Sequence, residues 1–550
     1  GSITINNPIN TAGITSVTLG TSNFVAGVNA GNSITSGGNY NTTIGDEAGT
    51  AITTGDNNVA VGYNSLTANT TGTDSVAIGH SALLAQTTGG DNVAIGHLAM
   101  SSLTTAGNNT AVGDRAMQAN TSGENNVAIG TLALDANTTG ASNTAVGRDS
   151  LGANTTGTEN LAAGFNALND NTTASYNTAL GSQSMGLNTT GHSNTATGNS
   201  SLYANTTGIQ NTAFGRSALT NNTTASENTA VGEQCLSANT TGTGNCGLGR
   251  QALNNNTTAS SNTGMGLYAL YANTTGSNNT AFGRSASEGN TTANSNTSIG
   301  YQALKQTSTG ASNVAVGADA LTDNTTGYNN TAVGKSALEV NTTGQQNTAY
   351  GTSAGHKLTT GSQNTCIGYV SGNALTTGTY NVFLGRAAGG SVTTDSNQLY
   401  IARDNTGVGN AATWIYGNSA GSCYQGSNAS TWSQVSDERI KKDIADSPNG
   451  LAKIDAIQVR NFNFRTEEEI TVEGLTACDA AGLQTGIIAQ ELELVLPNAV
   501  TENEKGMKQV QTDPIFWSMV KAIQELSAKN DALETQNATF AARLTALEGV

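Results

Sequence analysis

The sequence predicts a mainly β protein, in which a repetitive β-solenoid or β-roll forms a fibrous shaft and a smaller α+β domain ends in a coiled coil. Three observations support this fold class. A 17-residue repeat fills residues 40–396 without a break, charged residues make up only 11% and aromatic residues only 5% of the 550 residues, and the composition changes abruptly at residue 436. A chain with so little charge and so few large side chains does not build large globular cores. Repeated units can instead bury small apolar faces against one another.

The composition also excludes several kinds of partner. The formal net charge of −17 disfavours nucleic acid, because binding to the phosphate backbone depends on clustered Lys and Arg. No apolar run approaches the roughly 18 residues of a membrane span, so we expect no membrane insertion, and residues 1–10 lack the features of a secretory signal. The four histidines are scattered, so we expect no metal and no other cofactor.

The cysteines are odd in number and include no CxxC pair. This pattern favours free buried thiols over a framework of disulfides. The residues concerned are Cys235, Cys246, Cys366, Cys423 and Cys478.

Residues 1–39 precede the repeat, and we expect them to attach or cap the shaft. From Tyr40 the chain then passes through 21 consecutive 17-residue units to Ser396, and nothing is inserted or deleted. The sixth residue is Gly in every unit, from Gly45 to Gly385. An insertion would move side chains out of register with the next unit, so a constant length indicates that like residues stack on like.

A typical unit is NNVAVGYNSLTANTTGT, residues 57–73. Val59 and Val61 flank Ala60, a period of two that predicts a short strand with one face turned inward. The Ser65-Leu66 pair suggests a second short strand. Gly and the Asn-Thr-Thr-Gly string are typical of turns. Each unit is therefore expected to form one rung with two short strands and two turns.

Stacked rungs would align Asn and Thr side chains in ladders along the fibre, where they satisfy polar groups between rungs. The Leu of the repeat becomes Gly near both ends of the array, as expected for capping or junction rungs. The positions are Gly49, Gly355, Gly372 and Gly389.

The NTAVG and NVAIG strings resemble the head repeats of trimeric autotransporter adhesins and the shaft repeats of phage and bacterial surface fibres. The resemblance implies a homotrimer built from parallel β-rolls or interwound β-structure. A single-chain solenoid and an interwound triple β-helix both remain open at this point.

Residues 397–435 form an aromatic-rich junction or tip. They carry five large aromatic residues, whereas the repeat array contains no Trp. One interpretation is a knob that caps the open end of the solenoid. The other is a receptor-contacting tip, because exposed aromatic rings beside Ser, Asn and Gly suit recognition of glycans or proteins. The candidate receptor-binding residues are Trp414, Tyr416, Tyr424 and Trp432, and the fifth aromatic is Tyr400.

Residues 436–550 are charged and helix-prone, and they form a separate domain. Apolar residues and two asparagines recur there at alternating spacings of four and three, which predicts a coiled coil over about residues 516–548 and an oligomeric protein. Asn530 and Asn537 share one core position, where buried Asn fixes register. The seam comprises Met519, Ile523, Leu526, Asn530, Leu533, Asn537, Phe540, Leu544 and Leu547.

The SDERIKKDI string that starts at Ser436, the GIIAQE string from Gly486, Pro497 and the terminal coil resemble the intramolecular chaperone of phage endosialidases, tail spikes and fibres, also called peptidase S74. The resemblance implies that the domain trimerises, templates folding of the fibre before it and releases itself through a Ser-Lys dyad.

Carried onto this sequence, the family dyad gives Ser436 as nucleophile and Lys441 as general base, with scission expected at Val435-Ser436. Lys442 is the alternative base. A lysine whose pKa is lowered by burial or a cationic neighbour can activate a serine hydroxyl. Without the resemblance, Ser436 would be interpreted as a helix N-cap.

These expectations describe a structural fibre of a phage tail that attaches the virion to a host surface. Its only chemistry would be single-turnover autoproteolysis. The implied partners are two further copies in a homotrimer, a glycan or protein receptor on the host cell, and a tail or baseplate protein at the N-terminus. The alternative is a bacterial cell-surface adhesin or filament subunit that uses the same chaperone. A polysaccharide-degrading spike is disfavoured, because near-identical rungs leave no place for a distinctive carboxylate pair.

Overall fold

The computed structural model divides the chain into two compact units, Gly1–Thr431 and Trp432–Val550, which are described separately. The residues that it describes are 19–403, 413–419, 423–425, 445, 447, 450–470, 482–502 and 506–549.

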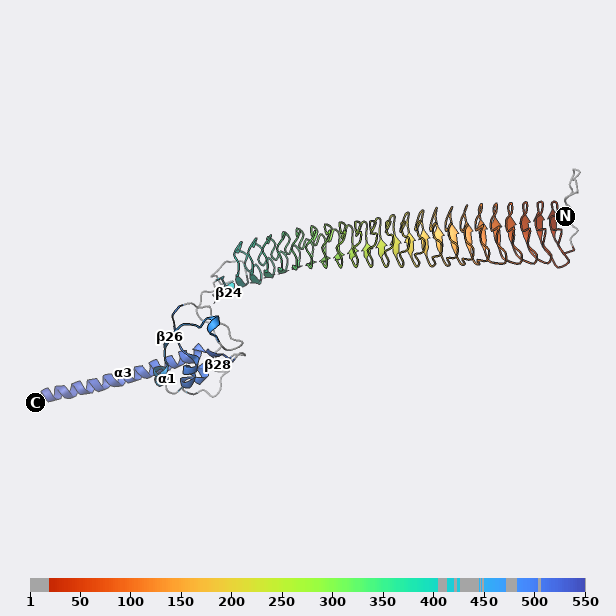
Figure 1. Ribbon diagram of the computed structural model, residues 1–550. Coiled ribbons are helices and arrows are strands. Elements are labelled where there is room, and N and C mark those ends of the chain that lie inside the picture. The colour runs from red at the N-terminus through yellow and green to blue at the C-terminus, as the bar shows by residue number, and fades with distance from the viewer. Residues whose placement is uncertain are drawn as a thin grey trace, which may run out of the picture. The chain divides into compact units, whose positions relative to one another are not determined.

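The first unit is a β-solenoid of about 22 turns, which confirms the predicted fold class (Figure 1). Its sheet has 25 strands. The strands from β1 (Phe24–Ala26) to β23 (Leu399–Ala402) are parallel, and β24 (Thr413–Gly417) and β25 (Cys423–Gln425) add to the end in antiparallel fashion. Between β1 and β23 lie β2 (Thr42–Ile44), β3 (Val59–Val61), β4 (Val76–Ile78), β5 (Val93–Ile95), β6 (Thr110–Val112), β7 (Val127–Ile129), β8 (Thr144–Val146), β9 (Leu161–Ala163), β10 (Thr178–Leu180), β11 (Thr195–Thr197), β12 (Thr212–Phe214), β13 (Thr229–Val231), β14 (Cys246–Leu248), β15 (Thr263–Met265), β16 (Thr280–Phe282), β17 (Thr297–Ile299), β18 (Val314–Val316), β19 (Thr331–Val333), β20 (Thr348–Tyr350), β21 (Thr365–Ile367) and β22 (Val382–Leu384).

Stacking starts before Tyr40 and continues beyond Ser396. β1 pairs with β2 in parallel, with an offset of 18 residues instead of 17, so the described part of residues 1–39 adds a rung of its own. At the other end β22 pairs with β23 in the regular register. The domain boundaries expected from the sequence stay predictions.

Each repeat contains one strand, at positions 3–5 when positions are counted from Tyr40. The middle residue is buried and its two neighbours face outward. In β3, Ala60 is buried, and Val59 and Val61 are the outward neighbours. The prediction of a second strand in each unit is wrong. Ser65-Leu66 lies in a turn in which Asn64 and Leu66 take positive φ angles of 57° and 51°. The Leu66 N–H still donates to the carbonyl of Ala82 in the next rung at 2.9 Å, and such hydrogen bonds hold a conformation that Leu otherwise avoids.

Two buried ladders of Asn run along the interior, as the sequence predicted. At position 2, the Nδ2 of Asn211 donates to Asn194 Oδ1 of the preceding rung at 3.2 Å and to the Ala225 carbonyl at 2.9 Å. At position 13, the Nδ2 of Asn222 donates to Asn205 Oδ1 and to the Ala225 carbonyl, each at 2.9 Å. The Asn of the Asn-Thr-Thr string is therefore both a turn residue and a core residue.

The Thr at position 14 forms a third, outer ladder. The hydroxyl of Thr206 donates to the Thr223 carbonyl at 3.1 Å, and Thr223 repeats the contact with Thr240. The interior is therefore held by polar pairs from rung to rung in addition to small apolar contacts. Buried polar groups cost little when they are paired in this way.

At the C-terminal end of the shaft, aromatic side chains enter the interior beside the position-2 ladder. Position 4 becomes Phe383 and then Tyr400, whose rings meet edge to face at 5.7 Å between centroids. Gly389 makes room, because a Cβ there would lie 2.5 Å from the Phe383 ring. Gly372 and Gly389, which replace Leu near this end, thus compensate for the larger strand residue Phe383. Tyr416 of β24 packs against the same cluster.

The second unit contains a 37-residue helix, α3 (Thr512–Glu548), and several short elements. These are α1 (Gly450–Ala456), β26 (Arg460–Phe462), η2 (Glu467–Glu469), β27 (Gln484–Gly486), α2 (Ala489–Val495), η3 (Pro497–Ala499), β28 (Val500–Glu502) and β29 (Lys508–Val510). β26 pairs with β27 and β28 with β29, both antiparallel. No helix in the described residues is long and apolar enough to cross a membrane.

Candidate functional site: the C-terminal unit

A small apolar core holds the second unit together. Leu492, Leu496 and Ala499 are buried where α2 runs into η3. The half-buried side chains packed on them come from the loop after α1, from the residues around α2, from both strands of the second hairpin and from the start of α3. They are Ile457, Ile487, Val495, Val500, Val510 and Ile515. Only a few side chains of the described part of this unit are fully buried.

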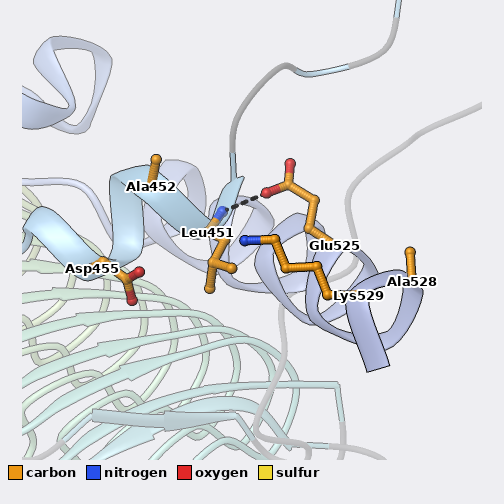
Figure 2. Close-up of a pocket in the computed structure, with 6 residues that line it drawn as sticks. All are labelled: Leu451, Ala452, Asp455, Glu525, Ala528 and Lys529. Carbon is orange, nitrogen blue, oxygen red and sulfur yellow. Dashed lines mark hydrogen bonds between the residues drawn. The ribbon is translucent and has the colours of Figure 1, made fainter. Parts of the chain in front are cut away.

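The main polar contact joins α1 to α3. The carboxylate of Glu525 accepts hydrogen bonds from the backbone N–H groups of Gly450 and Leu451, each at 2.9 Å, and Figure 2 shows the bond to Leu451. These N–H groups lower the pKa of Glu525, that of Leu451 being the larger cause. A carboxylate suits the first turn of a helix, where backbone N–H groups have no partner within the helix.

Gly450 is the residue that allows this close approach. A Cβ at this position would lie 2.5 Å from the backbone nitrogen of Ala522 on α3. The first turn of α1 is therefore held against α3 by close backbone packing as well as by hydrogen bonds. Sequence reasoning did not identify Glu525 or Gly450, because no local pattern links residues so far apart in the chain.

The same helices line an open recess of about 480 Å³. Its walls carry two carboxylates and one ammonium among small apolar side chains, which Figure 2 shows. The lining residues are Leu451, Ala452, Asp455, Glu525, Ala528 and Lys529. Among the described residues no group of three His, Cys, Asp or Glu side chains could hold a metal ion.

Two ion pairs link β26 and β29 to α2. The Arg460 guanidinium donates two hydrogen bonds to the Glu491 carboxylate, each at 3.0 Å, and Lys508 pairs with Glu493. The bidentate geometry fixes β26 relative to α2 in both distance and orientation. These contacts are exposed or half-buried, so each contributes little to stability by itself.

The seam of α3 is exposed. Ile523 is 66%, Phe540 62% and Leu547 75% exposed, although apolar residues at this spacing normally pack against a partner helix. The predicted helix is confirmed over the whole expected coil. In the single chain, the described residues leave this seam uncovered.

Several residues singled out from the sequence lie outside the described residues. These are Val435, Ser436, Lys441, Lys442 and Trp432. Of the other aromatic candidates, Trp414 is 60% exposed, Tyr416 is half-buried against the end of the shaft core, and Tyr424 lies in β25 with its side chain outside the description. The position of Tyr416 favours capping. Receptor contact by this group stays a prediction.

Together, the two units define a class of protein: a repetitive β-solenoid followed in the chain by a small α+β unit, whose long helix has an apolar seam that the described residues leave uncovered. Comparison with known families identifies that unit. Residues 436–501 match the family model of the chaperone of endosialidase, peptidase S74. No curated protein and no solved structure matches the chain. The C-terminal unit therefore carries an intramolecular chaperone domain, which supports a trimeric fibre.

Proposed function

We propose that this chain is the subunit of a trimeric phage tail fibre or tail spike that attaches to a host surface, and that its chaperone releases itself after assembly. The observation that carries the proposal is the combination of a long solenoid with a chaperone match that begins at Ser436. Stacked rungs of one length permit register slips, and long β-structures fold slowly. A trimerised end that starts three chains in step would remove that hazard.

The exposed seam of α3 supports the trimerisation step. Three copies of this 37-residue helix could cover one another's apolar residues, which no part of the described single chain does. The contact between Glu525 and the first turn of α1 would then link the trimerised helix to the chain that follows Ser436. Assembly could thereby influence the segment in which cleavage is proposed.

The proposed cleavage uses Ser436 and Lys441. Neutral Lys441 takes the hydroxyl proton while Ser436 Oγ attacks the carbonyl carbon of Val435, and the peptide nitrogen leaves with a proton as the free amine of Ser436. The resulting ester between the Val435 acyl group and Ser436 Oγ is hydrolysed by water. The products are a new carboxylate on Val435 and a chaperone fragment that begins at Ser436.

Intact-mass analysis beside denaturing electrophoresis tests this proposal. Wild type should yield a fragment of residues 436–550, whereas Ser436→Ala and Lys441→Ala should remain full-length. Lys453→Ala, on α1, is the matched control and should cleave like wild type. The fragment mass identifies the bond that breaks, and a Lys442→Ala variant tests the alternative base. An uncleaved wild-type chain that still forms trimers would leave a permanent trimerisation cap as the function of the domain.

The proposed partners also include a host-cell receptor. Trp414 is exposed beside the end of the shaft, which suits contact with a glycan or protein receptor. A tail or baseplate protein would hold the N-terminus. The adhesin-like repeat strings also suit a bacterial surface filament that borrowed the chaperone. Binding of purified fibre to intact cells, compared between wild type and Trp414→Ala, tests the receptor role.

A further inference from the structure

The outward face of the solenoid sheet carries a column of apolar side chains along almost its whole length. Positions 3 and 5 of the repeat point away from the rung interior, on either side of the buried position 4. Position 5 is Ile, Val, Leu, Phe, Met, Tyr or Ala in every strand from β1 to β23 except β11, which has Thr197. Large side chains there are well exposed: Phe214 is 56%, Phe282 54% and Tyr350 60% exposed.

The chemistry of this face differs from that of its surroundings. Neither position 3 nor position 5 carries a charged residue in any of these strands, and position 3 is mostly Thr or Val. Position 7, just past the Gly turn, is often charged instead, as with Arg216, Glu233 and Arg250. An apolar centre bordered by charge is the usual layout of a protein interface.

The face is also too long for an incidental surface patch. Strands about 4.8 Å apart extend it over roughly 100 Å, and positions 3 and 5 lie about 7 Å apart along a strand, so the strip covers roughly 700 Å². The largest apolar patch on a monomeric protein covers only about 300–600 Å². A partner that covers it must offer the same repeat at every rung. A second copy of the shaft, parallel and in register, has that period, and the proposed chaperone function would deliver such copies side by side.

We propose that positions 3 and 5 form the surface through which copies of this shaft pack on one another along the fibre. The inference rests on the proposed trimeric assembly and assigns its contact surface within the shaft. Identical apolar side chains would meet at the same height in each copy. The Thr column at position 15, also exposed, would remain on the outside of the fibre.

The chain contains its own reporters for a test. Cys246 occupies position 3 of β14 and lies on the proposed interface, half-buried in the single chain. Cys235 lies in the rung interior nearby, fully buried. Alkylation followed by peptide mapping can therefore report on the outer face and on the fold of the rung in the same sample.

In native wild-type fibre we expect Cys246 to react roughly 100-fold more slowly than a cysteine placed on the outside by Thr241→Cys. The double variant Val231→Glu/Leu248→Glu would place like charges at matching heights on the interface, so Cys246 should become reactive while Cys235 stays protected. Thr241→Glu/Thr258→Glu introduces the same charges at position 15 and should leave Cys246 protected.

The assembly state, measured by light scattering, separates this inference from the proposed function. A trimer in which Cys246 reacts as fast as the Thr241→Cys reporter would overturn the inference alone. Protection that survives the Val231→Glu/Leu248→Glu change would overturn it as well, because the chain itself would then cover Cys246. Protection of Cys246 that appears only after a glycan or a foreign protein is added would also overturn the inference. A monomeric chain would overturn both proposals. If the double variant unfolds and exposes Cys235, the inference is tested instead by comparing the alkylation rate of Cys246 in wild type with that of the Thr241→Cys reporter.

Discussion

The shaft and the C-terminal unit satisfy their side chains in different ways. In the shaft, buried Asn residues find partners one rung away in the same chain, and most rungs repeat these contacts. In the C-terminal unit, the described part of the chain leaves the apolar seam of α3 exposed. The interior of the shaft is thus formed within one chain, whereas the apolar seam of α3 is exposed in the single chain. Large apolar side chains on the outer face of the shaft sheet are exposed as well.

The comparison implies that a substitution in the shaft perturbs only the neighbouring rungs. Its cost in stability should depend on the free space around the substituted residue. Gly215→Ala should cost about 3 kcal/mol or more, because φ is +133° and a Cβ would lie 2.7 Å from the Gly232 carbonyl carbon in the next rung. Hydrogen exchange should accelerate in the rungs beside β12 and remain slow elsewhere, since each repeat contacts mainly its neighbours.

Gly244→Ala is the matched control. Gly244 also has a positive φ, +65°, but nothing lies within 4 Å of its added Cβ. The cost should be only about 1 kcal/mol, the strain of a left-handed backbone alone. Equal effects of the two changes would show that close packing of rungs does not limit stability.

The Asn ladder should be sensitive to charge and pH. Asn222→Asp replaces the Nδ2 that donates to Asn205 Oδ1 and to the Ala225 carbonyl with an oxygen, so acceptors face acceptors. The loss should be about 2–4 kcal/mol at neutral pH. Burial and the facing oxygens raise the pKa of the new carboxyl above its unfolded value. Stability should therefore be higher below the ordinary pKa of Asp and fall as pH rises through the raised folded value.

Thermal unfolding at acidic and neutral pH measures this effect. Asn221→Asp, one residue earlier, is exposed and should change the melting temperature little at either pH. A neutral-pH loss for Asn222→Asp that acid does not reduce would contradict the pairing described for the ladder.

The cap of α1 gives the C-terminal unit a pH dependence of the opposite sign. The backbone N–H groups of Leu451 and Gly450 lower the pKa of Glu525 below its ordinary value of 4.5. The stabilisation is therefore fully present above pH 4.5 and is lost as pH falls through the lowered folded pKa. Glu525→Ala should speed exchange of the α1 amides roughly fivefold at neutral pH.

Hydrogen exchange of the full chain, followed by peptide mapping of residues 450–456, measures this change. Glu534→Ala removes an exposed carboxylate from the same helix without touching α1, and it should leave these amides unchanged. Equal exchange in wild type and Glu525→Ala would show that shape at Gly450, and not the carboxylate, holds α1 on α3.

The shaft can be predicted from the sequence because one pattern of residues recurs in nearly every rung. A constant period, an inward Ala between outward residues and a recurring Asn were enough to predict rungs, one strand and the ladders. The second strand was not predicted correctly, since Leu66 at a φ of 51° contradicts its own backbone preference and is held there by hydrogen bonds to the next rung. Such a conformation depends on the stack and not on local sequence.

The C-terminal unit is predictable only where it is periodic. The seam spacing correctly predicts α3, but the contact of Glu525 with Gly450 and Leu451 joins segments about 75 residues apart and has no local pattern. The dyad of Ser436 and Lys441 rests on resemblance, and the family match begins at the same serine. Its geometry stays a prediction.

The smallest expected effect is a gain in stability where the position-13 ladder breaks. Thr307 interrupts the row of Asn, and Asn290 Oδ1 in the preceding rung is buried without a hydrogen-bond partner. Asn324 reaches the Thr307 hydroxyl only at 3.4 Å. Thr307→Asn should supply a donor to Asn290 and an acceptor to Asn324, and so stabilise the neighbouring rungs by about 1 kcal/mol.

Leu358→Asn is the informative counterpart. It would give Asn341 Oδ1, also buried without a partner, a donor. However, the next residue of the column is the buried Leu375, so the new Asn would expose its own oxygen to an apolar neighbour and lose the packing of Leu358. We expect slower hydrogen exchange around residue 307 in the first variant and faster exchange around residue 358 in the second. A gain in both would mean that any added Asn stabilises the shaft, whereas a gain only at 307 would show that the ladder stabilises a rung when it continues on both sides.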